Sequence, residues 1–126
     1  MKVNIKKDLK ESPNYNHYEI LMILTDGLIN DMDETVKLLI DCESLPLSVI
    51  IIGIGTSDFS NMVRLDGDEE PLTDNNGRVT KRDLVQFVEY EKFKKGYYKG
   101  NYEELSEEVL KEIPKQIEEF YGNLNQ

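Results

Sequence analysis

The sequence YEILMILTDG at residues 18–27 decides the fold. Its first part is almost continuously apolar, and the run stops at Thr25-Asp26-Gly27. A run of this kind is typical of a strand that is buried on both faces of a parallel sheet. We therefore predict a central parallel strand over residues 18–24.

A helix and a second strand follow this run. Asp31 can cap the helix, and Glu34 three residues later completes the pattern of a capping box. Residues 47–54 (LSVIIIGI) form a second continuous apolar run. A strand, a helix and a strand in this order form a right-handed parallel crossover, which predicts an α/β architecture. The residues expected on the inward face of the helix are Met32, Val36, Leu39 and Ile40.

The rest of the chain predicts one more strand and two more helices. A short helix is expected to begin at Asp58 and end near Leu65, followed by an exposed loop over 66–77 and a strand over 84–90. After a basic connector, Asn101 can cap a last helix, which Pro114 should kink or restart. The inward residues are predicted to be Phe59, Met62 and Val63 in the short helix, and Tyr102, Leu105, Val109, Ile113, Ile117 and Phe120 in the last.

Composition bounds the class of protein. The 126 residues suit one compact domain but are few for a complete doubly wound sheet, and we expect an exposed arm over 1–17 and a domain over 18–126. The net charge of -10 predicts no binding to nucleic acid. The single cysteine, Cys42, is expected to be a small buried hydrophobe in a cytosolic protein. A solvated face is favoured over an acidic or membrane contact for the basic residues of 78–99, which are Arg78, Lys81, Arg82, Lys92, Lys94, Lys95 and Lys99.

Asp26 is the leading candidate for a functional residue. A carboxylate at the carboxyl end of a buried parallel strand lies where open α/β sheets bind their ligands. Thr25, Asp31 and Asp33 add oxygen ligands of the kind that magnesium or calcium prefers. For Asp31 and Asp33 the structural explanation is favoured, with Asp31 capping the helix and Asp33 favouring its N-terminal dipole.

Other motifs carry less weight. The acidic loop at residues 66–70 lacks the ligand spacing of an EF-hand, and the glycines at 53 and 55 lack the third glycine of a dinucleotide-binding turn. The only histidine, His17, lies before the first strand, so no pair of nucleophile and base is visible.

Several segments together resemble the copine family. They are ILMILTDG at 20–27, INDM at 29–32, LPLSVIIIGIG at 45–55, LDGD at 65–68, RDLVQFV at 82–88 and LKEIPKQ at 110–116. The resemblance implies the C-terminal half of a von Willebrand factor A-like domain, with a doubly wound, three-layer and mostly parallel sheet of which about three strands and three helices are present. Copines tend to have Pro-Phe after the strand ending at Val88, where this chain has Glu89-Tyr90.

The resemblance also implies a metal site. Asp26 matches the aspartate of a metal-ion-dependent adhesion site, which holds magnesium or manganese in a complete domain. The Asp-x-Ser-x-Ser motif of that site is missing from this sequence, so we predict no tight metal binding by this chain alone. Calcium and phospholipid binding in the family belong to C2-type domains, which are absent here.

The function implied by the resemblance is that of a cytoplasmic adaptor that calcium brings to the membrane periphery and that binds target proteins. One alternative is a partner-recruiting domain of a ubiquitin ligase, and another is a magnesium-dependent phosphoryl-transfer enzyme that uses Asp26. A third is a fragment without independent activity. Because a further strand would lie beside residues 18–25 in a complete domain, we also expect self-association through that edge.

Overall fold

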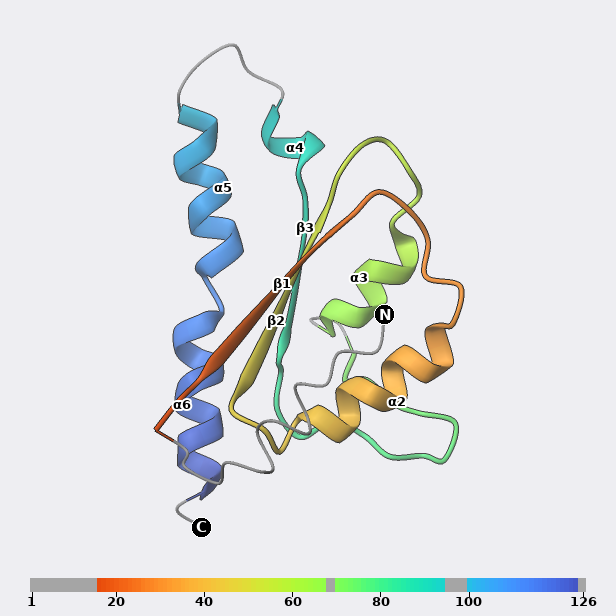
Figure 1. Ribbon diagram of the computed structural model, residues 1–126, viewed down its shortest axis with the longest axis vertical. Coiled ribbons are helices and arrows are strands. Elements are labelled where there is room, and N and C mark those ends of the chain that lie inside the picture. Colours follow the sequence, from red (N-terminus) through yellow and green to blue (C-terminus); the bar gives the residue numbers. More distant parts are fainter. Residues whose placement is uncertain (1–15, 68–69, 95–99, 125–126) are drawn as a thin grey trace.

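The computed structural model describes residues 16–67, 70–94 and 100–124, and these form an α/β fold (Figure 1). The three predicted strands and the predicted fold class are confirmed, whereas α4 is a short helix in a segment expected to be irregular. In chain order the elements are β1 (Glu19–Thr25), α2 (Met32–Cys42), β2 (Leu47–Gly53), α3 (Ser60–Asp66), β3 (Val85–Glu89), α4 (Glu91–Lys94), α5 (Gly100–Leu110) and α6 (Ile113–Leu124).

The three strands form one parallel sheet in the order β1-β2-β3. β1 pairs with β2 from Glu19 opposite Leu47 to Thr25 opposite Gly53, and β2 pairs with β3 from Val49 opposite Val85 to Gly53 opposite Glu89. Every residue of β2 is buried because this strand has a neighbour on each side and helices on both faces. The continuous apolar run at 47–54 therefore corresponds to β2, which is the central strand of the three.

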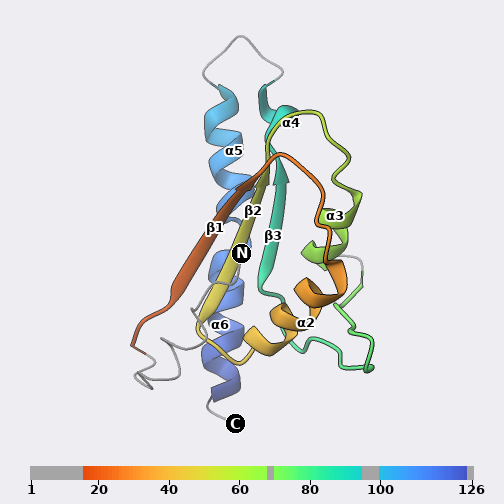
Figure 2. The same ribbon diagram turned by 45° about the vertical axis from the view of Figure 1, so that its right-hand side comes forward.

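Two helical layers cover the sheet (Figure 2). Alternate residues of β2 point to opposite faces. Val49 and Ile51 join the core with α2 and α3, and Ile50 and Ile52 join the core with α5 and α6. Cys42 is buried in the first of these cores, as predicted.

The prediction that the first strand is central and buried on both faces is wrong for the described chain. β1 is an edge strand, and Ile20, Met22 and Leu24 are 47%, 52% and 63% exposed. They point to the same face as Ile50 of β2, which is the face covered by α5 and α6. These two helices pack mainly against β3 and β2, so neither of them covers the outward side chains of β1 fully on this face.

Arg82 was expected on a solvated face and is instead only 5% exposed. Its Nε donates to the carbonyl of Glu43 at 2.8 Å, and its Nη2 donates to the carbonyls of Leu45 and Leu47 at 2.7 and 2.9 Å. The guanidinium also lies 5.2 Å from the centre of the Phe120 ring. Arg82 thus satisfies the carbonyls of the turn between α2 and β2, where the backbone leaves one element and enters the next.

The helix starts differ in detail from the predicted capping. Asp31 is the residue before α2, but its side chain makes no capping bond; its carbonyl accepts from the backbone and hydroxyl of Thr35 at 3.0 Å. The capping box is therefore wrong, although the helix begins where it was expected. α3 begins at Ser60, two residues after Asp58, and the Asp58 carboxylate accepts from the Ser60 N–H at 2.9 Å.

The predicted restart of the last helix at Pro114 is confirmed, since α5 ends at Leu110 and α6 begins at Ile113. Proline fits the first turn of α6 because its missing N–H has no partner to lose there.

Three expectations about burial are wrong. Val63 and Tyr102 are exposed, and the loop at 66–77 buries Asp66 and Leu72. The arm predicted over 1–17 lies outside the described residues up to residue 15.

Candidate functional site

Asp26 lies immediately after β1, with its side chain exposed at the carboxyl edge of the sheet. Its backbone carbonyl accepts from the Ser57 hydroxyl at 2.7 Å. The carbonyl of Thr25 accepts from the Ile54 N–H at 2.7 Å, and the Thr25 hydroxyl accepts weakly from the Gly27 N–H at 3.4 Å. These bonds tie the loop after β1 to the loop after β2, so Asp26 presents its carboxylate from a fixed backbone.

Asp31 and Asp33 lie farther along the same loop and in the first turn of α2, and both are exposed. Acidic residues at these positions stabilise the helix dipole, which suits the structural explanation. Among the residues that the structure describes, no three His, Cys, Asp or Glu side chains come close enough together to hold a metal ion. The residues of the described ranges therefore do not by themselves supply a set of carboxylates for magnesium or manganese.

A groove of about 400 Å³ lies between β1 and α2. Leu21 and Ile23 of β1 line it together with the exposed Leu28 and Leu38. Thr25 and Asp31 also line it, so two of the four predicted site residues share this groove, whereas Asp26 and Asp33 do not line it. The sequence signal for the groove was the presence of Leu28 and Leu38 outside the apolar stripe predicted for α2.

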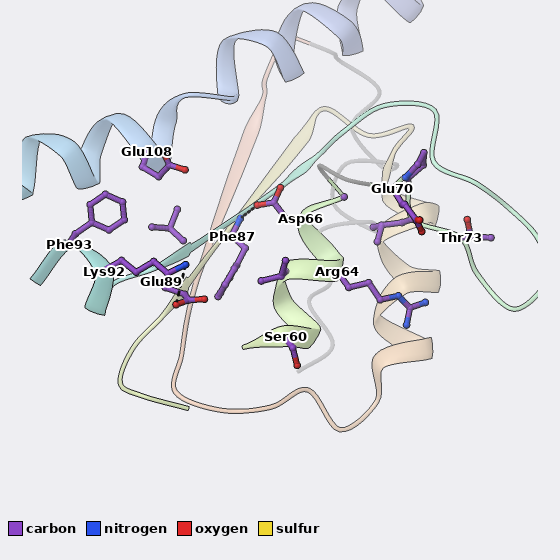
Figure 3. Close-up of a pocket in the computed structure, with 15 residues that line it drawn as sticks. Ser60, Arg64, Asp66, Glu70, Thr73, Phe87, Glu89, Lys92, Phe93 and Glu108 are labelled. Atoms are coloured by element: carbon purple, nitrogen blue, oxygen red, sulfur yellow. Dashed lines mark hydrogen bonds and ion pairs between the residues drawn. The ribbon is translucent and has the colours of Figure 1, made fainter. Parts of the chain in front are cut away.

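A second cavity of about 620 Å³ lies on the outer side of β3 (Figure 3). Arg64 and Asp66 come from α3, while Phe87 and Glu89 come from β3. Lys92 of α4 lies with its Nζ 3.6 Å from the Glu89 carboxylate. Sequence reasoning missed this cavity because its residues come from elements that are far apart along the chain.

The chemistry of this cavity is mixed. Cationic side chains of Arg64 and Lys92 and anionic ones of Glu89 and Glu108 line it together, so it favours no single charge of ligand. Asp26 is not among its lining residues. The hypothesis of phosphoryl transfer at Asp26 therefore gains no support from this cavity.

The arrangement of strands and helices agrees with what the copine-like segments imply, and comparison with known proteins decides the family. The model of the copine family matches residues 2–125. The chain belongs to the copine family. Its sheet and helices are thus a copine's α/β architecture, consistent with part of a von Willebrand factor A-like domain. None of the helices in the described ranges has the length and apolar character needed to cross a membrane.

Individual copine relatives match most of this chain but little of their own length. Copine-C of Dictyostelium discoideum is 52% identical over 81 residues, which are 64% of this chain and 15% of the relative. Copine-E of the same organism is 46% identical over 91 residues, which are 71% of this chain and 16% of the relative. The nicotinic receptor-associated protein 1 of Caenorhabditis elegans is 47% identical over 76 residues, which are 60% of this chain and 12% of the relative. The chain thus spans about one sixth or less of these relatives.

Proposed function

We propose that this chain is part of a non-enzymatic protein-binding module of a copine, with the carboxyl edge of the sheet facing the partner. The observation that carries the proposal is the exposed carboxylate of Asp26 on a backbone held by Ser57. Ligands of open α/β sheets bind outside the carboxyl ends of the strands. The apolar groove beside Thr25 and Asp31 adds a surface suited to a protein partner.

The name of one relative supports a protein partner. The nematode relative is named for its association with a nicotinic receptor. We take from that name only the class of partner, which is a protein. The adaptor role proposed here needs no reaction at the site.

In the complete domain, Asp26 would contribute one carboxylate to a magnesium or manganese ion, with the other ligands supplied from outside this chain. Calcium-dependent phospholipid binding would belong to other domains of the whole protein, which would be cytoplasmic and peripheral to membranes. For this chain, the net charge of -10 opposes contact with anionic lipid. Two of its clustered basic residues are engaged internally, because Arg82 is buried and Arg78 pairs with Asp41 and Asp74.

Affinity capture with matched variants tests the protein-binding proposal. The immobilised chain is exposed to cell lysate in the presence of magnesium, beside Asp26→Asn and the control Glu118→Gln, which changes an exposed carboxylate on α6. Proteins that depend on the carboxyl edge should be retained by the wild type and the control, and reduced about tenfold or more on Asp26→Asn. Equal retention on all three chains would remove the proposed role of this edge.

Calorimetric titration with magnesium and with manganese tests the metal prediction separately. We expect no sub-millimolar binding by the wild type, because one carboxylate cannot replace the several oxygen ligands that these ions take. Binding by the wild type that is lost in Asp26→Ala would show that this chain assembles a full ligand set, and the incomplete-site prediction would then be wrong.

A further inference from the structure

Part of the segment between α3 and β3 closes on itself as a small loop. Thr73 and Val79 form an isolated antiparallel bridge, and the Thr80 N–H donates to the Leu72 carbonyl at 2.9 Å. Leu72 is 6% exposed and anchors this segment in the core that α2 and α3 share with the sheet. Residues 72–80 therefore form a hairpin-like loop whose tip is exposed.

Asp74 holds the turn at the tip of this loop. Its Oδ1 accepts from the backbone N–H groups of Asn76 at 3.0 Å and Arg78 at 2.8 Å. Its Oδ2 accepts from Arg78 Nε at 2.7 Å, and its carbonyl accepts from the Gly77 N–H at 3.1 Å. The Asp74 side chain is only 3% exposed, although residues 75–77 are exposed. A single aspartate thus fixes the backbone before, at and after Gly77.

The tip of this turn contains the dipeptide Asn76-Gly77. Asparagine is chemically labile, because the backbone nitrogen of the next residue can attack its side-chain amide carbon. The nitrogen loses its proton to base, the new carbon–nitrogen bond closes a succinimide ring, and the amide nitrogen takes up a proton and leaves as ammonia. Water then opens the ring to aspartate or isoaspartate. Glycine favours the attack, because it has no side chain beside its nitrogen and its backbone rotates freely.

Asn76 is the only asparagine of the sequence that precedes a glycine. Aspartates precede glycine at Asp26 and Asp66, but an ionised carboxylate is a poor target for the attacking nitrogen. The carboxylate of Asp66 is also buried and accepts from the Phe87 N–H at 2.8 Å. The chemistry therefore favours Asn76 as the labile position.

We propose that Asn76 is a site of spontaneous deamidation and that Asp74 restrains the reaction in the folded chain. The attack requires the Gly77 nitrogen to lose its proton and to turn toward the amide carbon of Asn76. In the structure this N–H donates to the Asp74 carbonyl, and the adjacent N–H groups are held by the Asp74 carboxylate. The turn must open locally before the nitrogen can react, so the rate follows the population of the open turn.

Deamidation weakens the loop that contains it. Both products place a new negative charge beside Asp74, and isoaspartate also adds a carbon atom to the backbone before Gly77. The turn then cannot close with the same hydrogen bonds. Arg78 Nη1 donates to the Asp41 carboxylate of α2 at 2.8 Å, so the change extends to the contact between this loop and α2 (Figure 1).

Peptide mapping by mass spectrometry, after timed incubation at mildly alkaline pH, tests the proposal. In guanidinium chloride, where the chain is unfolded, Asn76 should become aspartate and isoaspartate at least about tenfold faster than in the folded chain, because the turn bonds are lost. Asp74→Ala should speed the reaction of the folded chain at least about fivefold, since two backbone N–H groups lose their acceptor. The same variant should leave the rate of the unfolded chain unchanged.

Two control variants separate the turn from other effects. Asp58→Ala removes another exposed carboxylate that accepts from a backbone N–H, that of Ser60 at 2.9 Å, and it should leave the rate at Asn76 unchanged. Gly77→Ala, measured in the unfolded chain alone, should slow the reaction because a methyl group hinders the attacking nitrogen. Circular dichroism checks that Asp74→Ala and Asp58→Ala are folded.

Hydrogen exchange measures the opening of the turn without relying on deamidation. The amide protons of Asn76, Gly77 and Arg78 should exchange slowly in the wild type and faster in Asp74→Ala. The exchange of amide protons within β2 should be the same in both chains, because the turn lies outside the sheet.

Three results would overturn the proposal. Equal rates at Asn76 in the folded and unfolded wild type would show that the turn gives no protection. An unchanged rate and unchanged exchange in Asp74→Ala would remove the role of Asp74. Faster conversion at Asp26 or at another asparagine of the unfolded chain would place the labile site elsewhere.

Discussion

At the scale of single residues, Gly53 shows how the carboxyl end of β2 is packed. A Cβ atom at this position would lie 2.9 Å from the Cε1 and Cζ atoms of Phe59. The ring of Phe59 is itself buried beside Phe87, with 5.7 Å between the ring centres. Glycine at 53 therefore allows the aromatic ring to pack against the strand backbone.

We predict that Gly53→Ala destabilises the fold by about 1–3 kcal/mol, because the buried ring must move to admit the methyl group. Urea denaturation measures the change. Gly27→Ala is the matched control, since a Cβ there meets nothing within 4 Å. Adding Phe59→Leu should reduce the penalty at Gly53, and an undiminished penalty in that double variant would show that the ring is not its cause.

Arg82 gives a second prediction at this scale. Replacing it by alanine removes the donors for three backbone carbonyls and is expected to cost about 3 kcal/mol in unfolding free energy. Arg82→Lys should recover only part of this loss, because one ammonium lacks the fork geometry of a guanidinium. Arg78→Ala should cost clearly less in the same denaturation experiment, as this side chain is 44% exposed. Equal losses at the two positions would contradict the buried role of Arg82.

At the scale of elements, the apolar runs predict the three strands well, while side-chain details at the ends are less predictable. The run at 47–54 marks β2 because a central strand is apolar throughout. The run at 18–24 looks the same, although β1 is an edge strand. Apolar composition shows that a strand can be buried. Whether it is buried depends on the neighbouring elements, which differ between β1 and β2. The capping box failed for a similar reason, since local spacing permits a bond that the side chain of Asp31 does not form.

The start of α3 gives a prediction about pH. The backbone N–H of Ser60, and then its hydroxyl, lower the pKa of Asp58 from its ordinary value of 3.8. A carboxylate whose pKa is lowered by folding stabilises the folded state above its unfolded pKa, and this contribution is lost as pH falls through the folded value. The support of α3 by Asp58 should therefore be complete above about pH 4 and should decline below it.

Titration of the Asp58 carboxyl signal by NMR checks this expectation. The wild-type pKa should lie below 3.8, and Ser60→Ala should raise it only in part, because the backbone N–H remains. Ser57→Ala serves as the control, since the hydroxyl of Ser57 bonds to Asp26 and leaves Asp58 unaffected. An Asp58 pKa at or above the ordinary value would contradict the bond seen in the structure.

At the scale of the whole molecule, the sequence indicates the family and the position of Asp26, whereas the surfaces around the site emerge only from the fold. Asp26 is predictable because it ends an apolar run. The groove between β1 and α2 brings together Leu21, Thr25 and Leu38. Such surfaces depend on how one element lies on another. Leu28 and Leu38 lie outside the predicted apolar stripe, but the sequence alone does not show which strand they lie beside.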